Sequence, residues 1–273
     1  MTLQAELELL EENLRIQEQQ PSMAYQAGRR TSLDGVAIPP EQNGQLQFHK
    51  APHIIRLVAP GNGWGKTAAA AVEADWYAQG NHPYQHEDMR RLAHRRRQII
   101  WVATKHQQFQ MMRPKIEKWL TPGFQWVGSP WWCYRWLNKA DMYVVTAETD
   151  WTTLQGIEPD LVIFDETPPA ALWYEFQKRR RSNTYTRFVM TATQTEGLTW
   201  MYSDVYKPWR DFHAKLGMTE EQAMLRQLHE YDIPGLKGVP GIWCWPKGSH
   251  RDNPTASLAS WAWYLVNTSG SPA

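Results

Sequence analysis

The sequence predicts an α/β fold built on a mainly parallel β-sheet with helices on both faces. Short apolar runs such as residues 160–165 recur along the chain, and runs of this kind are typical of fully buried strands. They alternate with longer segments that are typical of helices, which favours a parallel sheet. At 273 residues with 42% hydrophobic residues, the chain is long enough to bury one large core, or one core with a small appendage.

The expected elements follow one another in a regular order. An apolar strand at 54–58 precedes a helix that runs from Thr67 to about Gln79. Residues 121–150 alternate aromatic and β-forming residues, which indicates a strand or hairpin region. The further expected strands are 98–104, 160–165, 187–193 and 241–245, and the further expected helices are 107–120, 169–181 and 219–231. Before this core, residues 2–19 indicate an amphipathic helix, and the Pro- and Gly-containing residues 20–44 indicate a linker or loop.

The composition excludes several classes of protein. No apolar run approaches the roughly 20 residues of a membrane span, and the acidic, Gln-rich N-terminus is unlike an export signal. The cysteines Cys133 and Cys244 show no metal-ligand spacing, which fits a reducing cytoplasm. The net charge of +1 does not indicate general nucleic-acid binding, although basic runs at 90–97 and 178–181 are either solvated faces or phosphate contacts.

The most informative motif is a glycine-rich loop between the first strand and the helix that follows it. It reads Pro60-Gly61-Asn62-Gly63-Trp64-Gly65-Lys66-Thr67, and its position between a strand and a helix is the context of a Walker A motif. Backbone N–H groups of such a loop bind phosphates, and the glycines let the backbone approach them closely. We expect these eight residues to bind a nucleoside triphosphate, with Lys66 at the β- and γ-phosphates and the Thr67 hydroxyl on Mg²⁺.

A second motif places two acids at the end of a strand, as in a Walker B motif. The strand at 160–165 ends with Asp165, and Glu166 follows it. Because ligands of α/β sheets bind at the carboxyl ends of strands, we expect Asp165 at the end of a strand beside the loop, holding Mg²⁺. Glu166 is expected to polarise the attacking water as general base. Such a strand end is typical of hydrolytic, motor-like nucleotidases.

The next expected strand also ends in polar residues, Thr191-Ala192-Thr193-Gln194. In motor ATPases a polar strand end in this place can sense the γ-phosphate. We therefore expect Thr191, Thr193 and Gln194 to couple hydrolysis to movement.

Together these residues resemble the ATPase part of the large terminase subunit of tailed bacteriophages, the DNA-packaging motor. Gln45, followed three residues later by Phe48 and then by the loop at 60–67, is similar to the family's nucleotide-binding segment. The sequence Asp165-Glu166-Thr167-Pro168-Pro169 resembles its Asp-Glu-Glu-Pro-Pro, and residues 191–200 resemble its coupling motif. The resemblance covers about residues 37–255.

The resemblance implies a P-loop NTPase fold of the ASCE type and an enzyme that hydrolyses ATP with Mg²⁺ to translocate double-stranded viral DNA into a procapsid. It implies as partners double-stranded DNA, further copies of the chain in a homo-oligomeric ring, a portal protein and a small terminase subunit, all in the host cell cytoplasm and without a membrane. It also implies that Gln45 reads the adenine.

Two departures from the family pattern shape the expectations. Gly63 stands where many relatives carry an arginine that stabilises transition-state charge, so that role would fall elsewhere. Arg179 is one candidate, acting within its own subunit or across a ring interface, and the basic run at 95–97 is another. The chain also lacks the carboxylate cluster of the family's nuclease, so no nuclease activity is expected. The expected domains are an N-terminal helix and linker at 1–36, a P-loop ATPase domain at 37–255, and a tail at 256–273 towards the absent nuclease.

Two other functions stay open at this point. A helicase-like or other P-loop ATPase would share the chemistry but would also separate strands. A non-hydrolysing nucleotide-binding scaffold would explain Pro60 and Gly63 as signs of a decayed site, whereas the intact Lys66, Thr67 and Asp165-Glu166 argue against it.

Overall fold

A computed structural model describes residues 43–61, 63–149, 154, 156–179, 186–193, 200–225 and 241–246. The expected helix at 2–19, nearly all of the expected linker and the expected tail lie outside the described residues, as do Asn62 and Gln194. None of the helices in the described part of the chain is long and apolar enough to cross a membrane.

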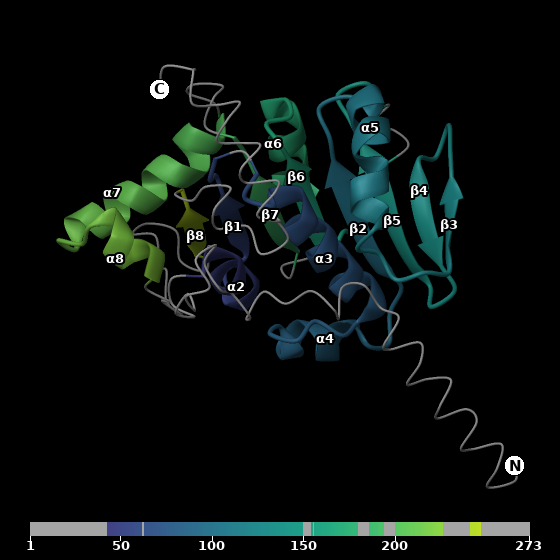
Figure 1. Ribbon diagram of the computed structural model, residues 1–273, viewed down its shortest axis with the longest axis horizontal. Coiled ribbons are helices and arrows are strands. Elements are labelled where there is room, and N and C mark those ends of the chain that lie inside the picture. Colours follow the sequence, from purple (N-terminus) through teal and green to yellow (C-terminus); the bar gives the residue numbers. More distant parts are fainter. Residues whose placement is uncertain are drawn as a thin grey trace, which may run out of the picture.

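Within the described residues, the core is one eight-stranded sheet with the strand order β3-β4-β5-β2-β6-β7-β1-β8 (Figure 1). Every pair of neighbours is parallel except β3 with β4 and β4 with β5, which are antiparallel. This confirms the expected mainly parallel α/β fold. The strands are β1 (Ile55–Val58), β2 (Arg97–Val102), β3 (Phe124–Val127), β4 (Cys133–Trp136), β5 (Ala140–Val145), β6 (Leu161–Asp165), β7 (Arg187–Thr191) and β8 (Ile242–Trp245).

Helices cover both faces of this sheet. From β1 to β2 and from β2 to β5, the chain moves along the sheet towards β3. From β6 to β7, it moves the opposite way, towards β8. Because parallel crossovers are right-handed, α3 and α5 lie on one face and α6 on the other (Figure 1). The helices are α2 (Gly44–Lys50), α3 (Lys66–Gln79), α4 (His86–Leu92), α5 (His106–Glu117), α6 (Ala170–Arg179), the π-helical turn η4 (Tyr202–Tyr206), α7 (Lys207–Lys215) and α8 (Glu220–Leu225).

The helices α2, α4 and α7 and the π-helical turn η4 were not predicted from the sequence. α2, α4 and α7 have seven, seven and nine residues, too short for a clear helical period. Asn43 is the N-cap of α2, and its side chain accepts a hydrogen bond from the backbone N–H of Leu46 at 3.1 Å. Gly44, which we expected at the end of a linker, is the first residue of this helix.

The expected position of the acidic strand needs a correction. We expected it beside the strand that leads into the glycine-rich loop, but β7 lies between β6 and β1. Thr191 is in register with Asp165 on one side and with Val58 on the other. The carboxyl ends of the three strands therefore lie level, and the end of β7 separates the loop from the acids.

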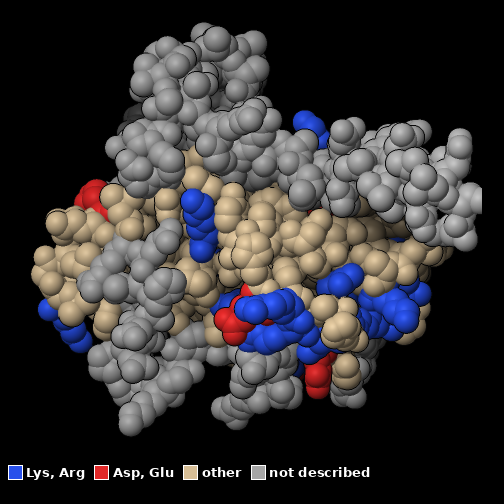
Figure 2. Space-filling view, turned by 90° about the horizontal axis from the view of Figure 1, so that it is seen from below, with Lys and Arg blue, Asp and Glu red and all other residues tan. Residues whose placement is uncertain are grey.

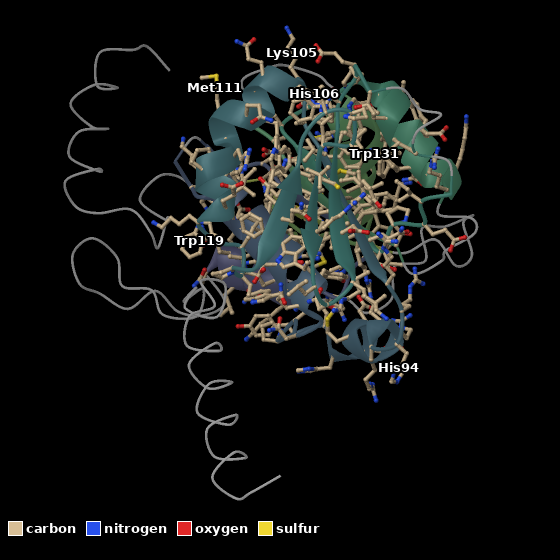
Figure 3. All side chains as sticks on the ribbon, turned by 90° about the vertical axis from the view of Figure 1, so that its right-hand side faces the viewer. His94, Lys105, His106, Met111, Trp119 and Trp131 are labelled. Atoms are coloured by element: carbon tan, nitrogen blue, oxygen red, sulfur yellow. The ribbon has the colours of Figure 1, made fainter. Side chains whose placement is uncertain are left out.

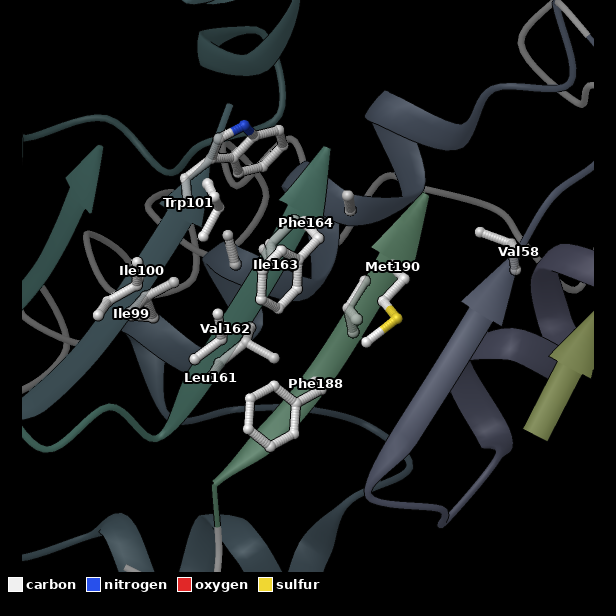
Figure 4. Packing of buried hydrophobic residues seen from close by; sticks show 14 of the residues in the cluster. Val58, Ile99, Ile100, Trp101, Leu161, Val162, Ile163, Phe164, Phe188 and Met190 are labelled. Carbon is white, nitrogen blue, oxygen red and sulfur yellow. The ribbon is translucent and has the colours of Figure 1, made fainter. Parts of the chain in front are cut away.

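The strands that lead to the loop and to the acids are buried on both faces of the sheet. All residues of β1 and β6 are buried, as expected of parallel strands covered on both faces. Figure 4 shows how side chains of β2, β6 and β7 pack against one another, among them Ile99, Ile100, Trp101, Leu161, Val162, Ile163, Phe164, Phe188 and Met190.

A charged cluster inside the core fastens α3 to β1 and α2. The carboxylate of Glu73 accepts hydrogen bonds from Arg56 at 2.6 and 3.1 Å, and its Oε1 lies 2.6 Å from Nδ1 of His49 and 3.1 Å from Nε2 of His82. These four side chains are almost fully buried. Arg56 is the main cause that holds the pKa of Glu73 well below its usual value, against the effect of burial. Burial lowers the pKa of both histidines. The helix that begins at the loop is thus held in place by a buried ion pair.

Candidate active site

The glycine-rich loop connects β1 directly to α3 and turns on two glycines. Gly63 and Gly65 have φ angles of 77° and 95°, in the left-handed region that residues with a Cβ rarely adopt. Gly65 is the N-cap of α3, a helix of 14 residues. The loop therefore presents the N-terminus of a long helix, where backbone N–H groups and the helix dipole favour an anion.

Lys66 lies folded over this loop. Its Nζ donates to the carbonyl oxygens of Pro60 at 2.8 Å and Gly61 at 3.4 Å, and to Oγ1 of Thr193 at 3.1 Å. Burial lowers the pKa of Lys66, and the carboxylates of Glu166 and Asp165 act in the opposite direction. The lysine is thus close to both acids of the second motif.

Asp165 and Thr191 form a pair across neighbouring strands. The hydroxyl of Thr191 donates to Oδ1 of Asp165 at 3.0 Å, and the Asp165 side chain is largely buried at the end of β6. Burial raises the pKa of Asp165 to about 6. The hydrogen bond from Thr191 and the charge of Lys66 lower it, whereas the charge of Glu166 raises it. A carboxyl group perturbed in this way is common at functional sites.

Glu166 is held in an unusual backbone conformation by a neighbouring strand end. Its φ angle is 61°, which is uncommon for a residue with a side chain and is often found at functional sites. Its Oε2 accepts from the backbone N–H of Thr193 at 3.0 Å, and its Oε1 accepts from the Thr193 hydroxyl at 2.9 Å. Because this hydroxyl also accepts from Lys66, a continuous hydrogen-bonded chain joins Lys66, Thr193 and Glu166.

A cavity of about 450 Å³ opens over this arrangement. Lys66, Thr67 and Glu166, which the sequence analysis assigned to one site, all line it. The rest of the lining is Gly63, Trp64, Gly65 and Ala68 from the loop and α3, and Met112, Lys115, Lys118 and Trp119 from α5 and the residues after it. The residues from α5 were not expected, because no local pattern in the sequence tells which helix lies over the loop.

The site contains oxygen ligands that suit Mg²⁺. Thr67 offers a hydroxyl in the first turn of α3, and Asp165 offers a carboxylate at the neighbouring sheet edge, the hard oxygen donors that this cation prefers. A divalent cation would also favour the ionised form of Asp165, whose pKa is raised to about 6 by burial. The residues present therefore fit the expected cation.

Gln45 supports the loop from α2. Its side chain is fully buried and donates from Nε2 to the carbonyl oxygen of Trp64 at 2.6 Å, while the Trp64 ring is itself buried. This contact fixes the middle of the loop. The role of Gln45 at an adenine stays a prediction.

The two sources considered for an arginine finger lie in different places. Arg179, the last residue of α6, donates to Glu175 at 3.1 Å and to the carbonyl oxygen of Leu154. The basic run at 95–97 lies where β2 begins, at the opposite edge of the sheet from the loop. Figure 2 looks onto that edge and shows basic and acidic side chains gathered together. Since β2 is six residues long, about 20 Å of sheet separates this run from the site in the same chain.

The model of the family described as "Terminase large subunit, T4likevirus-type, N-terminal" matches residues 58–235, which is more than half of the chain. No match was found among curated proteins.

Several solved structures are similar to this chain. The large terminase ATPase domain of Thermus phage P74-26 is 19% identical, with 84% of this chain and 87% of that one covered and a TM-score of 0.49. The HK97 bacteriophage large terminase is 14% identical, with 74% and 42% covered and a TM-score of 0.45. The large terminase of a thermophilic bacteriophage, in complex with ADP, is 10% identical, with 82% and 48% covered and a TM-score of 0.46.

Proposed function

The chain belongs to the terminase large subunit family, whose T4likevirus-type N-terminal model it matches, and we propose how its residues perform the ATPase reaction of this DNA-packaging motor. The observation that carries the proposal is the hydrogen-bonded chain from Lys66 through Thr193 to Glu166. It joins the phosphate loop, the strand end expected to couple hydrolysis to movement, and the acid expected to activate water.

ATP would bind with its phosphates against the loop at 60–67 and the N-terminus of α3. The backbone N–H groups there and the Lys66 ammonium would face the β- and γ-phosphates. Thr67 and Asp165 would hold Mg²⁺, which when bound would neutralise charge on the phosphate oxygens. Gln45 would read the adenine from α2 while it supports the loop.

Glu166 would orient the attacking water and accept its proton. The two hydrogen bonds from Thr193 fix the direction of this carboxylate, which is the preorganisation that a general base needs. Since Lys66 and Glu166 line the same cavity, the base and the cation that binds the terminal phosphate face one space.

The same contacts suggest how hydrolysis is sensed. Lys66 donates to Thr193, and it is also the cation that would bind the terminal phosphates. A phosphate that draws Lys66 towards itself would weaken this bond, so the end of β7 would respond to the presence of the γ-phosphate. Thr191 would keep Asp165 oriented at the same strand end, and Gln194 is proposed to act with them.

The wider assembly is also part of the proposal. Arg179 would serve as the arginine finger after leaving Glu175 and the Leu154 carbonyl, either in its own subunit or across a ring of identical copies. The ring would dock on a portal protein, act with a small terminase subunit, and move double-stranded DNA in the host cytoplasm. Its grip would be mainly on phosphates and therefore sensitive to salt. Residues 37–255 would form the ATPase domain, between a helix and linker at 1–36 and a tail at 256–273.

The test is ATP hydrolysis by the purified chain as a function of its concentration, with and without linear duplex DNA. Lys66→Ala should abolish turnover, and Glu166→Gln should abolish turnover while ATP binding persists. Glu158→Gln is the matched control, because Glu158 is an exposed acid close to the amino end of β6, away from the site, and its removal should leave turnover unchanged.

Three results would contradict the proposal. Turnover that survives in Glu166→Gln would show that Glu166 is not the general base. Turnover equal in the wild type and Lys66→Ala would assign the hydrolysis to a contaminant, and strand separation without translocation of duplex DNA would favour a helicase-like ATPase instead.

A further inference from the structure

Two lysines, Lys115 of α5 and Lys118 directly after this helix, line the same cavity as the phosphate loop. Lys115 and Lys118 line it together with Lys66, Thr67 and Glu166. They are three residues apart, so they lie on one side of the helix. The cavity is therefore lined both by the loop and by residues of α5, and α5 was not part of the site expected from the sequence.

The ammonium groups of these two lysines are available to bind an anion. Both side chains are exposed, and within the part of the chain that the structure describes neither ammonium forms an ion pair. Lys118 lies with its Nζ 5.4 Å from the centre of the ring of Trp119, which also lines the cavity, in a cation–π contact. In contrast, the ammonium of Lys66 already donates to two carbonyl oxygens and to Thr193.

The charge around the cavity favours additional cations. Lys66 faces both Asp165 and Glu166, and the proposed ligand adds a polyphosphate to these two carboxylates. Since Glu166 lines the cavity and is the proposed base, its side of the cavity is the one that would contain the terminal phosphate. Lys115 and Lys118 line the same cavity as Glu166, so they share the space that would contain the terminal phosphate.

We propose that Lys115 and Lys118 are a second set of phosphate-binding residues, which α5 and the residue directly after it supply in the same subunit to the terminal phosphate of ATP. This inference rests on the proposed ATPase function and extends its site to a second helix. The two flexible ammonium groups are point charges that can follow the phosphate, unlike the backbone N–H groups of the loop.

The test measures the binding of ATP, ADP and AMP to Lys115→Ala, Lys118→Ala and the double variant, each compared with the protein that keeps both lysines. All proteins used for ATP binding also carry Glu166→Gln, which prevents turnover. Because each lysine gives one partly screened charged contact, each single variant should lose about 10-fold in ATP affinity and much less in ADP affinity. AMP binding should not change. The loss should shrink as salt is raised, and Lys115→Arg, which keeps the charge, should bind ATP like the wild type.

Lys105→Ala is the matched control. Lys105 is an exposed lysine at the other end of α5, and Figure 3 shows it projecting away from the protein. Its removal should leave all three affinities unchanged. Unchanged ATP affinity in the double variant, or an equal loss for ATP, ADP and AMP, would overturn the inference. Either result would leave the proposed function intact as long as the wild type hydrolyses ATP and Lys66→Ala does not.

Discussion

Replacing Thr191 with valine should move the acid limb of the ATPase pH profile to higher pH. Valine keeps the branched shape that suits the buried strand β7 but removes the hydroxyl. That hydroxyl donates to Asp165 at 3.0 Å and is a cause that lowers the pKa of this carboxyl group. The variant tests whether Asp165 must be ionised for the enzyme to work.

The size of the shift follows from the contact. Thr191 is 1% exposed, so water does not replace the lost hydrogen bond. A hydrogen bond to a charged group contributes about 1.5–3 kcal/mol, which corresponds to a pKa change of about 1–2 units. Starting from a pKa raised to about 6 by burial, Asp165 in the variant would be substantially protonated at neutral pH. Because Mg²⁺ competes with that proton, the variant should also need more Mg²⁺ at pH 7.

The assay is steady-state ATP turnover between about pH 5 and about pH 9 at fixed Mg²⁺, repeated at higher Mg²⁺. The acid limb of the Thr191→Val profile should lie at higher pH than that of the wild type. Added Mg²⁺ should move the acid limbs of both proteins to lower pH. Thr186→Val is the control, because the Thr186 hydroxyl donates to the carbonyl oxygen of Pro159 next to the opposite end of β7. Coincident limbs for the wild type and Thr191→Val, with both proteins folded, would refute the reasoning.

Three further predictions concern the core and the strand end. Glu73→Ala leaves the buried Arg56 without its ion-pair partner and should lower the free energy of unfolding by about 3–5 kcal/mol in urea titration; an unchanged midpoint would contradict it. Burial lowers the pKa of His49 and His82 below 6.5, so the unfolded chain binds more protons just below that pH and stability should fall from about pH 8 to about pH 6. Equal urea midpoints across that range would be evidence against this cluster. Thr193→Val removes the hydroxyl between Lys66 and the proposed base Glu166, so kcat should fall by at least about 10-fold with little change in ATP affinity. An unchanged kcat would show that the Thr193 hydroxyl does not couple hydrolysis to movement.

Features that depend on neighbouring residues could be predicted from the sequence. The loop at 60–67 lies between a strand and a helix as expected, and Gly63 and Gly65 occupy the left-handed conformations that such a turn demands. The strand that ends at Asp165 and the one that ends near Thr193 were also predicted, because their apolar runs are continuous and bounded by polar residues. The residue types of the two motifs were enough to predict a nucleotide site.

How these parts meet depends on contacts between residues that are distant in the sequence. Lys66 and Thr193 are 127 residues apart in the chain, and their contact exists because β7 lies between β1 and β6, an order that no local pattern specifies. The same holds for the lysines of α5, whose place at the cavity depends on how that helix packs beside α3. Local hydrogen bonding and hydrophobic periodicity act over a few turns or one strand, so they determine elements and motifs. The order of strands and the packing of helices depend on which distant surfaces bury each other best, so they emerge only when the whole sheet is assembled.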